Sequence, residues 1–232
     1  EDKKTETNEV MFALQHSAKH KIASNYGKSY YPSDYSPNAG WADYYGNEDF
    51  FKAYPNDDRK EWNYMTEWKI KSGEIIPYTE SADKLPAISK YYDYDEGAPG
   101  KSAQSNGITC IYRYAEVLLM YAEASTRATN SVNQDALNAI QEVQKRAGYQ
   151  DRQIELTTTT EPTAFLAAVS NERGWEFFAE MKRWFELVRL EKVKEVRAEE
   201  WDASTFNTNH HYYFPVPYQQ VDLAGWTNNA GY

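Results

Sequence analysis

The pattern of apolar and polar positions divides the chain into a turn-rich first part and a helical second part. Residues 24–107 are interrupted throughout by Gly, Pro, Asn, Asp and Ser, which favour turns. Before them, the apolar run from Val10 to Leu14 predicts a short β-strand. We expect region 1–107 to consist of long loops with short elements, and we expect these loops to be ordered because disordered segments contain few aromatic residues.

Helical periodicity is clear in the segment "IYRYAEVLLMYAEASTRA", from Ile111 to Ala128. Its charged residues fall on one stripe, while apolar residues cover most of the remaining circumference. This distribution predicts a helix that is buried on two sides. The charged stripe is expected to face water, where Glu123 and Arg127 are four residues apart and can form an ion pair.

A second helix is predicted in "SVNQDALNAIQEVQKRAG", from Ser131 to Gly148. Its apolar residues recur at intervals of three and four, Ser131 or Asn133 can cap its start, and Gly148 can end it. The two helices are expected to pair as a hairpin within residues 108–148. A single pair of this kind is the unit of a helical repeat, and such repeats need several stacked units for stability.

A third and longer helix is predicted over residues 162–197. Pro162 is tolerated in a first turn, and Phe177, Met181 and Trp184 recur at helical spacing, which predicts that they face inward. Residues 198–232 include the run "HHYYFPVPY" and are expected to form an extended C-terminal segment.

Charge and composition narrow the classes of function. The formal net charge is −10 and Lys and Arg are not clustered, which argues against a nucleic-acid partner. No run of about 18 apolar residues is present that could span a bilayer. Aromatic residues make up 16% of the chain, and amphipathic rings of this kind often line binding surfaces. Cys110 is the only cysteine, so an internal disulfide is excluded, and we expect a buried thiol.

Four segments also stand out by their order and content: "YRYAEVLLMYAEA", "ALNAIQEVQKRAG", "NERGWEFFAEMKRWFELVR" and "YYFPVPYQQVDLAGWTNNAGY". In this order they resemble the C-terminal half of the SusD/RagB family, nutrient-binding surface lipoproteins of Gram-negative bacteria. Weaker matches at "NEVMFALQHS" and "NDDRKEW" extend the resemblance over nearly the whole chain.

The resemblance implies a mainly α-helical fold, the C-terminal part of a tetratricopeptide-like superhelix with long ordered loops and a few short strands. The N-terminal half of the family, with its lipidated cysteine, is then absent, in keeping with a chain start that carries no signal peptide. Members of the family lie over a TonB-dependent transporter at the cell surface of the outer membrane and deliver glycans, or in some branches peptides, to it. The resemblance implies binding without catalysis and without a cofactor.

The candidate ligand-binding residues lie in the aromatic loops. Trp41, Tyr44 and Tyr45 are placed near a loop tip, and an earlier run contributes three more rings, Tyr26, Tyr30 and Tyr31. Indole and phenol faces can stack against the C–H face of a sugar ring. Neighbouring rings at Phe50, Phe51 and Tyr54 are instead expected to anchor the loop on the helices.

Arg59 is a further candidate, because a planar guanidinium beside an aromatic ring suits carbohydrate recognition. It belongs to the short motif Asp57–Asp58–Arg59, which resembles a motif of the family. A structural role in a turn with a buried or bridging ion pair is the favoured interpretation of that motif.

Three other patterns allow both a functional and a purely structural interpretation. Glu172, Glu176 and Glu180 could supply the carboxylates of a glycoside hydrolase, but charges in such a ladder are usually compensated by neighbouring cations. His210 and His211 do not favour zinc, because adjacent residues of an extended segment point to opposite faces. The acidic run Asp93, Asp95 and Glu96 could hold calcium, although a solvated loop is favoured. A helical-repeat scaffold that binds only protein remains the alternative from another class.

Overall fold

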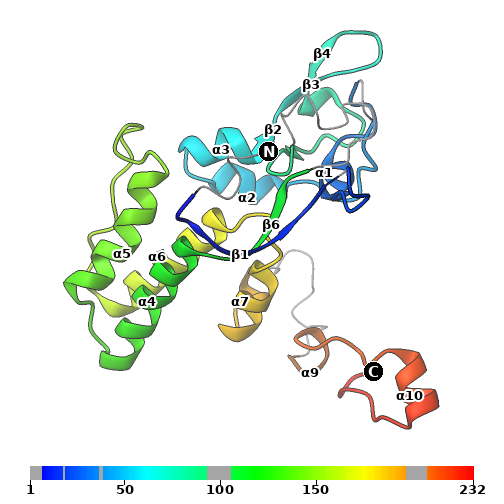
Figure 1. The fold of residues 1–232 in the computed structure, drawn as a ribbon. Helices are drawn as coiled ribbons and strands as arrows, with labels where there is room; N and C mark the ends of the chain where they lie inside the picture. Colours follow the sequence, from blue (N-terminus) through cyan, green and yellow to red (C-terminus); the bar gives the residue numbers. More distant parts are fainter. Residues whose placement is uncertain (1–6, 18, 37–38, 93–105, 197–207) are drawn as a thin grey trace. The chain divides into compact units, whose positions relative to one another are not determined.

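The computed structural model describes residues 7–17, 19–36, 39–92, 106–196 and 208–232 (Figure 1). Over these ranges the protein is built mainly of helices with a few short strands, so the predicted fold class is confirmed. The chain forms two compact units, residues 1–180 and residues 181–232. Among the helices of the described ranges, none has both the length and the apolar character needed to cross a membrane.

The strands of the first unit pair as short antiparallel ribbons. Among the described residues, β1 (Val10–Gln15) pairs with β6 (Ile108–Arg113), β2 (Tyr64–Met65) with β5 (Ala87–Ile88), and β3 (Glu67–Lys69) with β4 (Ile75–Pro77). The apolar run at the start of the chain is therefore a strand, as predicted. Its register sets Phe12 opposite Tyr112, with irregularities on either side of this pair.

The helices of the first unit fall into a loop-rich part and a packed bundle. The loop-rich part carries α1 (Tyr26–Tyr30), α2 (Glu48–Ala53), α3 (Asp58–Asn63) and the 3-10 helix η1 (Tyr78–Glu80), and the bundle consists of α4 (Tyr114–Thr129), α5 (Gln134–Arg146) and α6 (Pro162–Glu176).

The bundle contains the hydrophobic core. Leu119, Ile140, Phe165 and Val169 are fully buried where α4 packs on α5 and α6 (Figure 1). Asn133 caps α5 by accepting a 2.7 Å hydrogen bond from the backbone N–H of Ala136. The predicted helical hairpin is therefore present, and of the two possible caps, Ser131 and Asn133, it is Asn133 that caps α5.

The charged stripe of α4 faces inward, contrary to the prediction. Glu116 and Glu123 are both buried, and Glu116 lies 3.7 Å from Arg173 of α6. Glu123 does form its ion pair with Arg127, at 2.8 Å. Periodicity alone could not reveal this orientation, because a cation on another helix provides the partner that makes carboxylate burial tolerable.

The long helix predicted over residues 162–197 is not continuous. Helix α6 ends at Glu176, and the chain then turns, with positive φ angles of 59° at both Ala179 and Met181. Left-handed backbone of this kind cannot continue an α-helix. Met181, predicted to face inward, is exposed.

The second unit contains α7 (Arg183–Arg189), α8 (Val193–Val196), α9 (Thr208–His211) and α10 (Tyr218–Ala224). Residues 198–232 were predicted to be extended, whereas their described part includes two short helices. Gly225 ends α10 in a left-handed conformation, with φ of 65°. Pro215 and Pro217 separate α9 from α10, because a proline has no backbone N–H and its ring clashes with a preceding helical turn.

Candidate functional site

The candidate site is built on α1 and on the loop that follows it. Residues 40–44, here called the aromatic loop, donate five successive backbone hydrogen bonds to carbonyl oxygens of residues 28–32, at 2.7 to 3.2 Å. Gly40 is required for this approach, since a Cβ there would lie 1.8 Å from the carbonyl oxygen of Tyr31. The aromatic loop is therefore fixed to the backbone of α1.

Two of the predicted rings on the aromatic loop are open to solvent. Trp41 is 51% exposed and Tyr44 is 60% exposed. The ammonium group of Lys28 lies 5.1 Å from the centroid of the Trp41 ring, within the range of a cation–π contact. Asp43 stands exposed between the two rings in the sequence. Together they offer apolar ring faces beside one cation and one carboxylate.

The rings of the earlier run form a layer beneath. Tyr30 is 6% exposed and its ring stacks on that of Tyr91, with 5.6 Å between the ring centroids. The centroid of the Tyr44 ring lies 5.7 Å from that of Tyr30. Tyr26 is half-buried and its ring lies 5.4 Å from that of Tyr91. Burial raises the pKa of Tyr30, so its hydroxyl stays protonated at neutral pH.

Tyr31 and Tyr45 are also held by neighbours. Tyr31 is buried, and its ring lies 5.4 Å from that of Tyr92. The hydroxyl of Tyr45 donates a 2.6 Å hydrogen bond to Asp83, and burial together with this carboxylate raises the pKa of Tyr45. Of the six predicted rings, Trp41 and Tyr44 thus have free faces, and the other four support them or the surrounding loops.

Of the residues predicted to anchor the loop on the helices, Phe50 and Tyr54 contact residues at or just after the end of α6, whereas Phe51 packs within the loop-rich part. The Phe50 ring stacks on Phe178 at 5.9 Å. The hydroxyl of Tyr54 donates a 2.6 Å hydrogen bond to the carbonyl of Trp175. The Phe51 ring meets Tyr64 edge to face at 4.8 Å.

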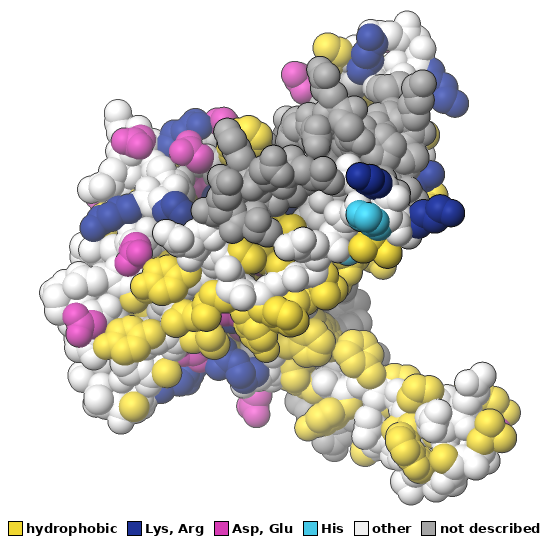
Figure 2. Space-filling model, viewed as in Figure 1, with side chains coloured by type: hydrophobic (Ala, Val, Ile, Leu, Met, Phe, Trp, Pro, Cys, Tyr) yellow, Lys and Arg dark blue, Asp and Glu magenta, His cyan; other side chains and the backbone are white. Residues whose placement is uncertain are grey.

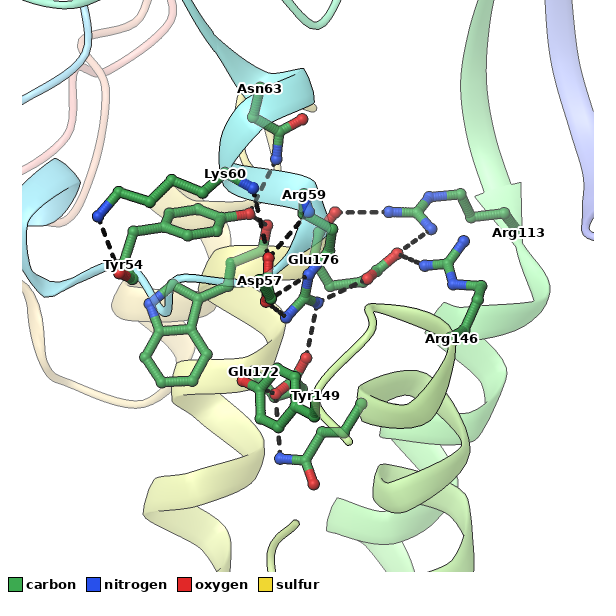
Figure 3. Close-up of polar contacts among 12 residues, drawn as sticks. Tyr54, Asp57, Arg59, Lys60, Asn63, Arg113, Arg146, Tyr149, Glu172 and Glu176 are labelled. Carbon is green, nitrogen blue, oxygen red and sulfur yellow. Dashed lines mark hydrogen bonds and ion pairs between the residues drawn. The ribbon is translucent and has the colours of Figure 1, made fainter. Parts of the chain in front are cut away.

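Arg59, the remaining candidate, lies in a buried network of ions (Figure 3). Its guanidinium contacts Asp57 at 2.6 Å, Glu172 at 2.6 Å and Glu176 at 2.8 Å. Its side chain is only 12% exposed. The structural interpretation of the motif that contains Arg59 is the one that the geometry supports, because all three contacts are to carboxylates of the protein itself.

The glutamate ladder supplies most of that network. Glu176 also pairs with Arg113 and Arg146, and Glu180 pairs with Arg113 at 2.7 Å and Lys90 at 2.6 Å. We call Asp57, Arg59, Glu172, Glu176 and Glu180 with these cations the charged network. It joins α3, β6, α5 and α6, as Figure 3 shows for most of its members.

Burial and cations act in opposite directions on these carboxylates. Burial alone would raise the pKa of Glu176, but the guanidinium groups of Arg113, Arg146 and Arg59 outweigh it and lower that pKa. The pKa of Glu180 is lowered in the same way by Lys90 and Arg113. Glu176 and Glu180 are therefore ionised at neutral pH, whereas burial outweighs the nearby Arg59 and raises the pKa of Glu172.

A cavity of about 510 Å³ opens beside the charged network. It is lined by Glu9, Trp62, Lys90, Cys110 and several members of the network. Cys110 is half-buried, and burial raises the pKa of its thiol. The thiol is therefore not activated as a nucleophile.

Only some of the candidate metal-binding residues lie within the described parts of the chain. No group of three His, Cys, Asp or Glu side chains suited to a metal occurs in the described parts of the chain. The segment with Asp93, Asp95 and Glu96 lies outside the described residues. His210 and His211 end helix α9, so the argument from an extended segment was wrong. The ring of His210 stacks on Tyr232 at 4.2 Å, and its Nδ1 lies 2.8 Å from the Gly231 carbonyl.

Three residues that contact the predicted rings were not identified from the sequence. Lys28 contacts Trp41, Asp83 contacts Tyr45, and Tyr91 contacts both Tyr26 and Tyr30. Tyr91 had a signal, since it lies in the same kind of tyrosine-rich run as Tyr30. Lys28 and Asp83 had none, because isolated charges in turn-rich segments are common.

Comparison with known proteins agrees with this architecture. The sequence profile of the SusD family matches residues 66–232. SusD-like protein P2 of Formosa agariphila is 28% identical over 200 residues, which are 78% of this chain and 39% of that protein. A SusD superfamily protein from Parabacteroides distasonis has a similar structure, with a TM-score of 0.78 and 23% identity over 99% of this chain and 51% of that one.

A third similar structure is surface glycan-binding protein A of Bacteroides thetaiotaomicron in complex with laminarihexaose. It has a TM-score of 0.72 and 22% identity, over 99% of this chain and 53% of that one. The chain thus spans about half of the length of these solved relatives and less of the curated one. By the match of the family profile to most of its length, the chain belongs to the SusD family.

Proposed function

We propose that this protein captures a nutrient oligosaccharide by stacking it against Trp41 and Tyr44. The observation that carries the proposal is a pair of exposed rings on a loop held by five backbone hydrogen bonds. A platform fixed in this way loses little conformational entropy when a ligand binds, so contact area is converted efficiently into affinity. Lys28 and Asp43 supply a donor and an acceptor for sugar hydroxyl groups beside the rings.

The expected affinity is modest. Covering roughly 80 Å² of one ring face at about 25 cal/mol/Å² stabilises a complex by on the order of 2 kcal/mol. Two rings with a few hydrogen bonds therefore give a dissociation constant in the micromolar to millimolar range, which corresponds to about 4 to 8 kcal/mol. This range suits a protein that must release what it captures.

Two further observations support binding rather than hydrolysis. The carboxylates at 172, 176 and 180 are all engaged by Arg or Lys side chains of the protein. One of the structurally similar proteins is a glycan-binding protein in complex with an oligosaccharide, laminarihexaose.

By the family resemblance, the captured glycan is handed to a TonB-dependent transporter at the surface of the outer membrane. A lipid anchor on an N-terminal part outside this chain would hold the protein there. Peptide capture by the same surface, and a scaffold that binds only protein, are the competing functions.

The test is titration of laminarihexaose, a panel of other oligosaccharides and a panel of short peptides, followed by calorimetry and Trp fluorescence. We expect at least one oligosaccharide to bind, and Trp41→Ala to weaken it roughly 30-fold, the equivalent of about 2 kcal/mol. Trp226→Ala is the matched control, because Trp226 is 58% exposed, close to the 51% of Trp41, and belongs to the second unit, outside the aromatic loop.

Each outcome separates the competing functions. Equal loss of affinity in both Trp variants would move the site away from the aromatic loop. A response to peptides alone would establish the peptide alternative. No response to either panel, with retention of a TonB-dependent transporter from a membrane extract, would establish the scaffold. Reducing ends released by the protein but not by Glu176→Gln would establish an enzyme.

A further inference from the structure

A four-residue turn lies between the charged network and the helix that carries the aromatic loop. Residues 89–92, here called the linking turn, are closed by a 2.7 Å hydrogen bond from the backbone N–H of Tyr92 to the carbonyl of Ser89. Ser89 is buried, and its backbone N–H donates a 3.0 Å hydrogen bond to the carbonyl of Asn63 at the end of α3. The linking turn is therefore fixed to the loop-rich part of the first unit.

One end of the linking turn is anchored in the charged network. The ammonium of Lys90 donates to Oε1 of Glu180 at 2.6 Å and to the backbone carbonyl of Glu176 at 3.2 Å. The Lys90 side chain is 22% exposed, and burial lowers its pKa although the Glu180 carboxylate acts in the opposite direction. The hydroxyl of Tyr91 donates a 3.1 Å hydrogen bond to the carbonyl of Ala179, in the left-handed segment that follows α6. Two successive residues thus fix the turn to the chain around the end of α6.

The ring of Tyr91 also packs against α1. It stacks on Tyr30, with an angle of 12° between the ring planes, and its centroid lies 5.4 Å from that of Tyr26 on the same helix. The two backbones meet as well, because a Cβ at Gly27 would lie 3.0 Å from the carbonyl oxygen of Tyr91. Glycine at this position therefore permits α1 to approach the main chain of the linking turn.

Helix α1 is too short to fix its own position. It has five residues, and the side chain of its N-cap residue, Asn25, makes no capping hydrogen bond. Isolated helices of this length are not stable in water, so contacts with the rest of the protein must fix α1. The aromatic loop takes its position from α1 through hydrogen bonds to the backbone of residues 28–32. A contact that fixes α1 therefore also fixes Trp41 and Tyr44.

We propose that Lys90 and Tyr91 are positioning residues of the glycan site, which hold α1 and thereby set the geometry of the rings of Trp41 and Tyr44. This inference rests on the proposed function, because it assigns a role in glycan binding to two residues outside the aromatic loop. Tyr91 is half-buried, its ring is stacked on Tyr30 and its hydroxyl is engaged by a backbone carbonyl. It therefore acts through α1 and not on the ligand.

The first test compares Tyr91→Leu with Tyr91→Phe in calorimetry with laminarihexaose, or with the oligosaccharide of the panel that binds most tightly. We expect Tyr91→Leu to weaken binding about tenfold, because a loop that is no longer held in place must be ordered when the ligand binds. Tyr91→Phe keeps the stacked ring and should bind within about threefold of the parent protein. Tyr78→Leu is the matched control, because Tyr78 is also half-buried and its ring packs on Phe51; it should leave the affinity unchanged.

The second test removes the anchor in the charged network. Lys90→Met takes one cation from Glu180, and we expect glycan affinity to fall by roughly three- to tenfold, because the linking turn is then free to shift with α1. Lys60→Met is its matched control, since Lys60 is likewise half-buried and donates a 3.1 Å hydrogen bond to a backbone carbonyl, that of Tyr54. Lys60→Met should bind the oligosaccharide as the parent protein does.

A spectroscopic measurement on Trp41 separates positioning from a general loss of stability, and it needs no glycan. The protein is labelled with fluorotryptophan, and the fluorine line of Trp41 is assigned from the spectrum of Trp41→Phe. We expect Tyr91→Leu and Lys90→Met to move or broaden this line. The line of Trp226, assigned in the same way, should stay unchanged because Trp226 belongs to the second unit.

A further control lies on the surface of the bundle. The face of α4 with Val117, Met120 and Tyr121 is exposed, although the periodicity predicted burial on two sides, and Figure 2 shows hydrophobic side chains gathered over this helix. Tyr121→Leu makes the same change as Tyr91→Leu outside the linking turn. It should alter neither the Trp41 line nor the affinity.

The outcomes distinguish this inference from the proposed function. Binding that is lost in Trp41→Ala but unchanged in Tyr91→Leu and Lys90→Met would leave the proposed function standing and overturn the positioning role. Equal losses in Tyr78→Leu and Tyr91→Leu, or an unchanged Trp41 line, would also overturn it. If Tyr91→Leu does not fold, Lys90→Met decides by the same measurements. If no oligosaccharide binds, the proposed function fails, and the Trp41 line alone decides whether the linking turn positions the aromatic loop.

Discussion

The charged network and the aromatic loop hold their side chains in opposite ways. In the network, Arg59 reaches three carboxylates and almost nothing of it meets solvent. In the aromatic loop, the backbone makes the fixed contacts with α1, while the rings of Trp41 and Tyr44 stay open. Rigidity in the first region comes from side chains, and rigidity in the second comes from main chain. Side chains remain available for a ligand only in the second arrangement.

The largest loss of stability is expected from Arg59→Met, which removes a central cation of the charged network. The change leaves Asp57 and Glu172 buried without their guanidinium partner, and we expect the free energy of unfolding to fall by about 3 to 5 kcal/mol in urea titration. Arg152→Met is the matched control: Arg152 also pairs with two carboxylates, of Asp58 and Glu61, but at the surface. Arg152→Met should cost far less stability than Arg59→Met because water screens exposed ion pairs, and equal losses would show that burial does not set the strength of the network.

The second largest effect is expected from acid, which should weaken the charged network. The pKa values of Glu176 and Glu180 are lowered in the folded protein, so their contribution is fully present above the unfolded value of about 4.3 and is lost as pH falls below it toward the folded values. Each carboxylate then changes the free energy of unfolding by about 1.4 kcal/mol per pH unit. Urea titrations between pH 6 and pH 3 measure this slope.

Glu180→Gln isolates the contribution of one group to that slope. With one fewer lowered pKa, the free energy of unfolding should depend less steeply on pH in the acid range. Identical slopes for the variant and the parent protein would contradict the assigned role of Glu180. The proposed glycan contacts are made by apolar ring faces of Trp41 and Tyr44, so glycan affinity at pH 5 should match that at pH 7.

A smaller effect is expected where the backbone sets the geometry. Gly40→Ala would place a methyl group 1.8 Å from the carbonyl oxygen of Tyr31, which forces the aromatic loop away from α1. We expect about 1 to 2 kcal/mol of lost stability and a clear loss of glycan affinity by calorimetry. The neighbouring Ala42 has a φ of 55°, so Ala42→Gly should change stability little and preserve binding. A Gly40→Ala protein with unchanged affinity would contradict the role of the backbone contacts.

Local patterns predicted the elements, and contacts between distant residues decided the rest. The β1 strand, the α4–α5 hairpin and the Asn133 cap followed from spacing and side-chain chemistry. The burial of the Glu116 side chain depends on its ion pair with Arg173 of another helix. The end of α6 depends on the left-handed backbone at Ala179 and Met181. The periodicity of apolar residues predicts neither feature.

The same division holds for the candidate site. The richness in aromatic residues led to the loop on which the candidate site is built, and exposure then separated Trp41 and Tyr44 from the four other rings. That separation depends on distant neighbours, because Tyr91 stacks on the ring of Tyr30 and Asp83 accepts a hydrogen bond from the hydroxyl of Tyr45. Composition alone treats all six rings alike.

The pairing of Arg59 with Glu172 has a consequence for how the protein is made. The two residues are 113 positions apart, and Glu172 leaves the ribosome long after Arg59. Until then Arg59 can pair with Asp57 but not with the carboxylates of α6. The charged network therefore closes only after α6 has been made, so the loop-rich part depends on late-made residues for its final structure.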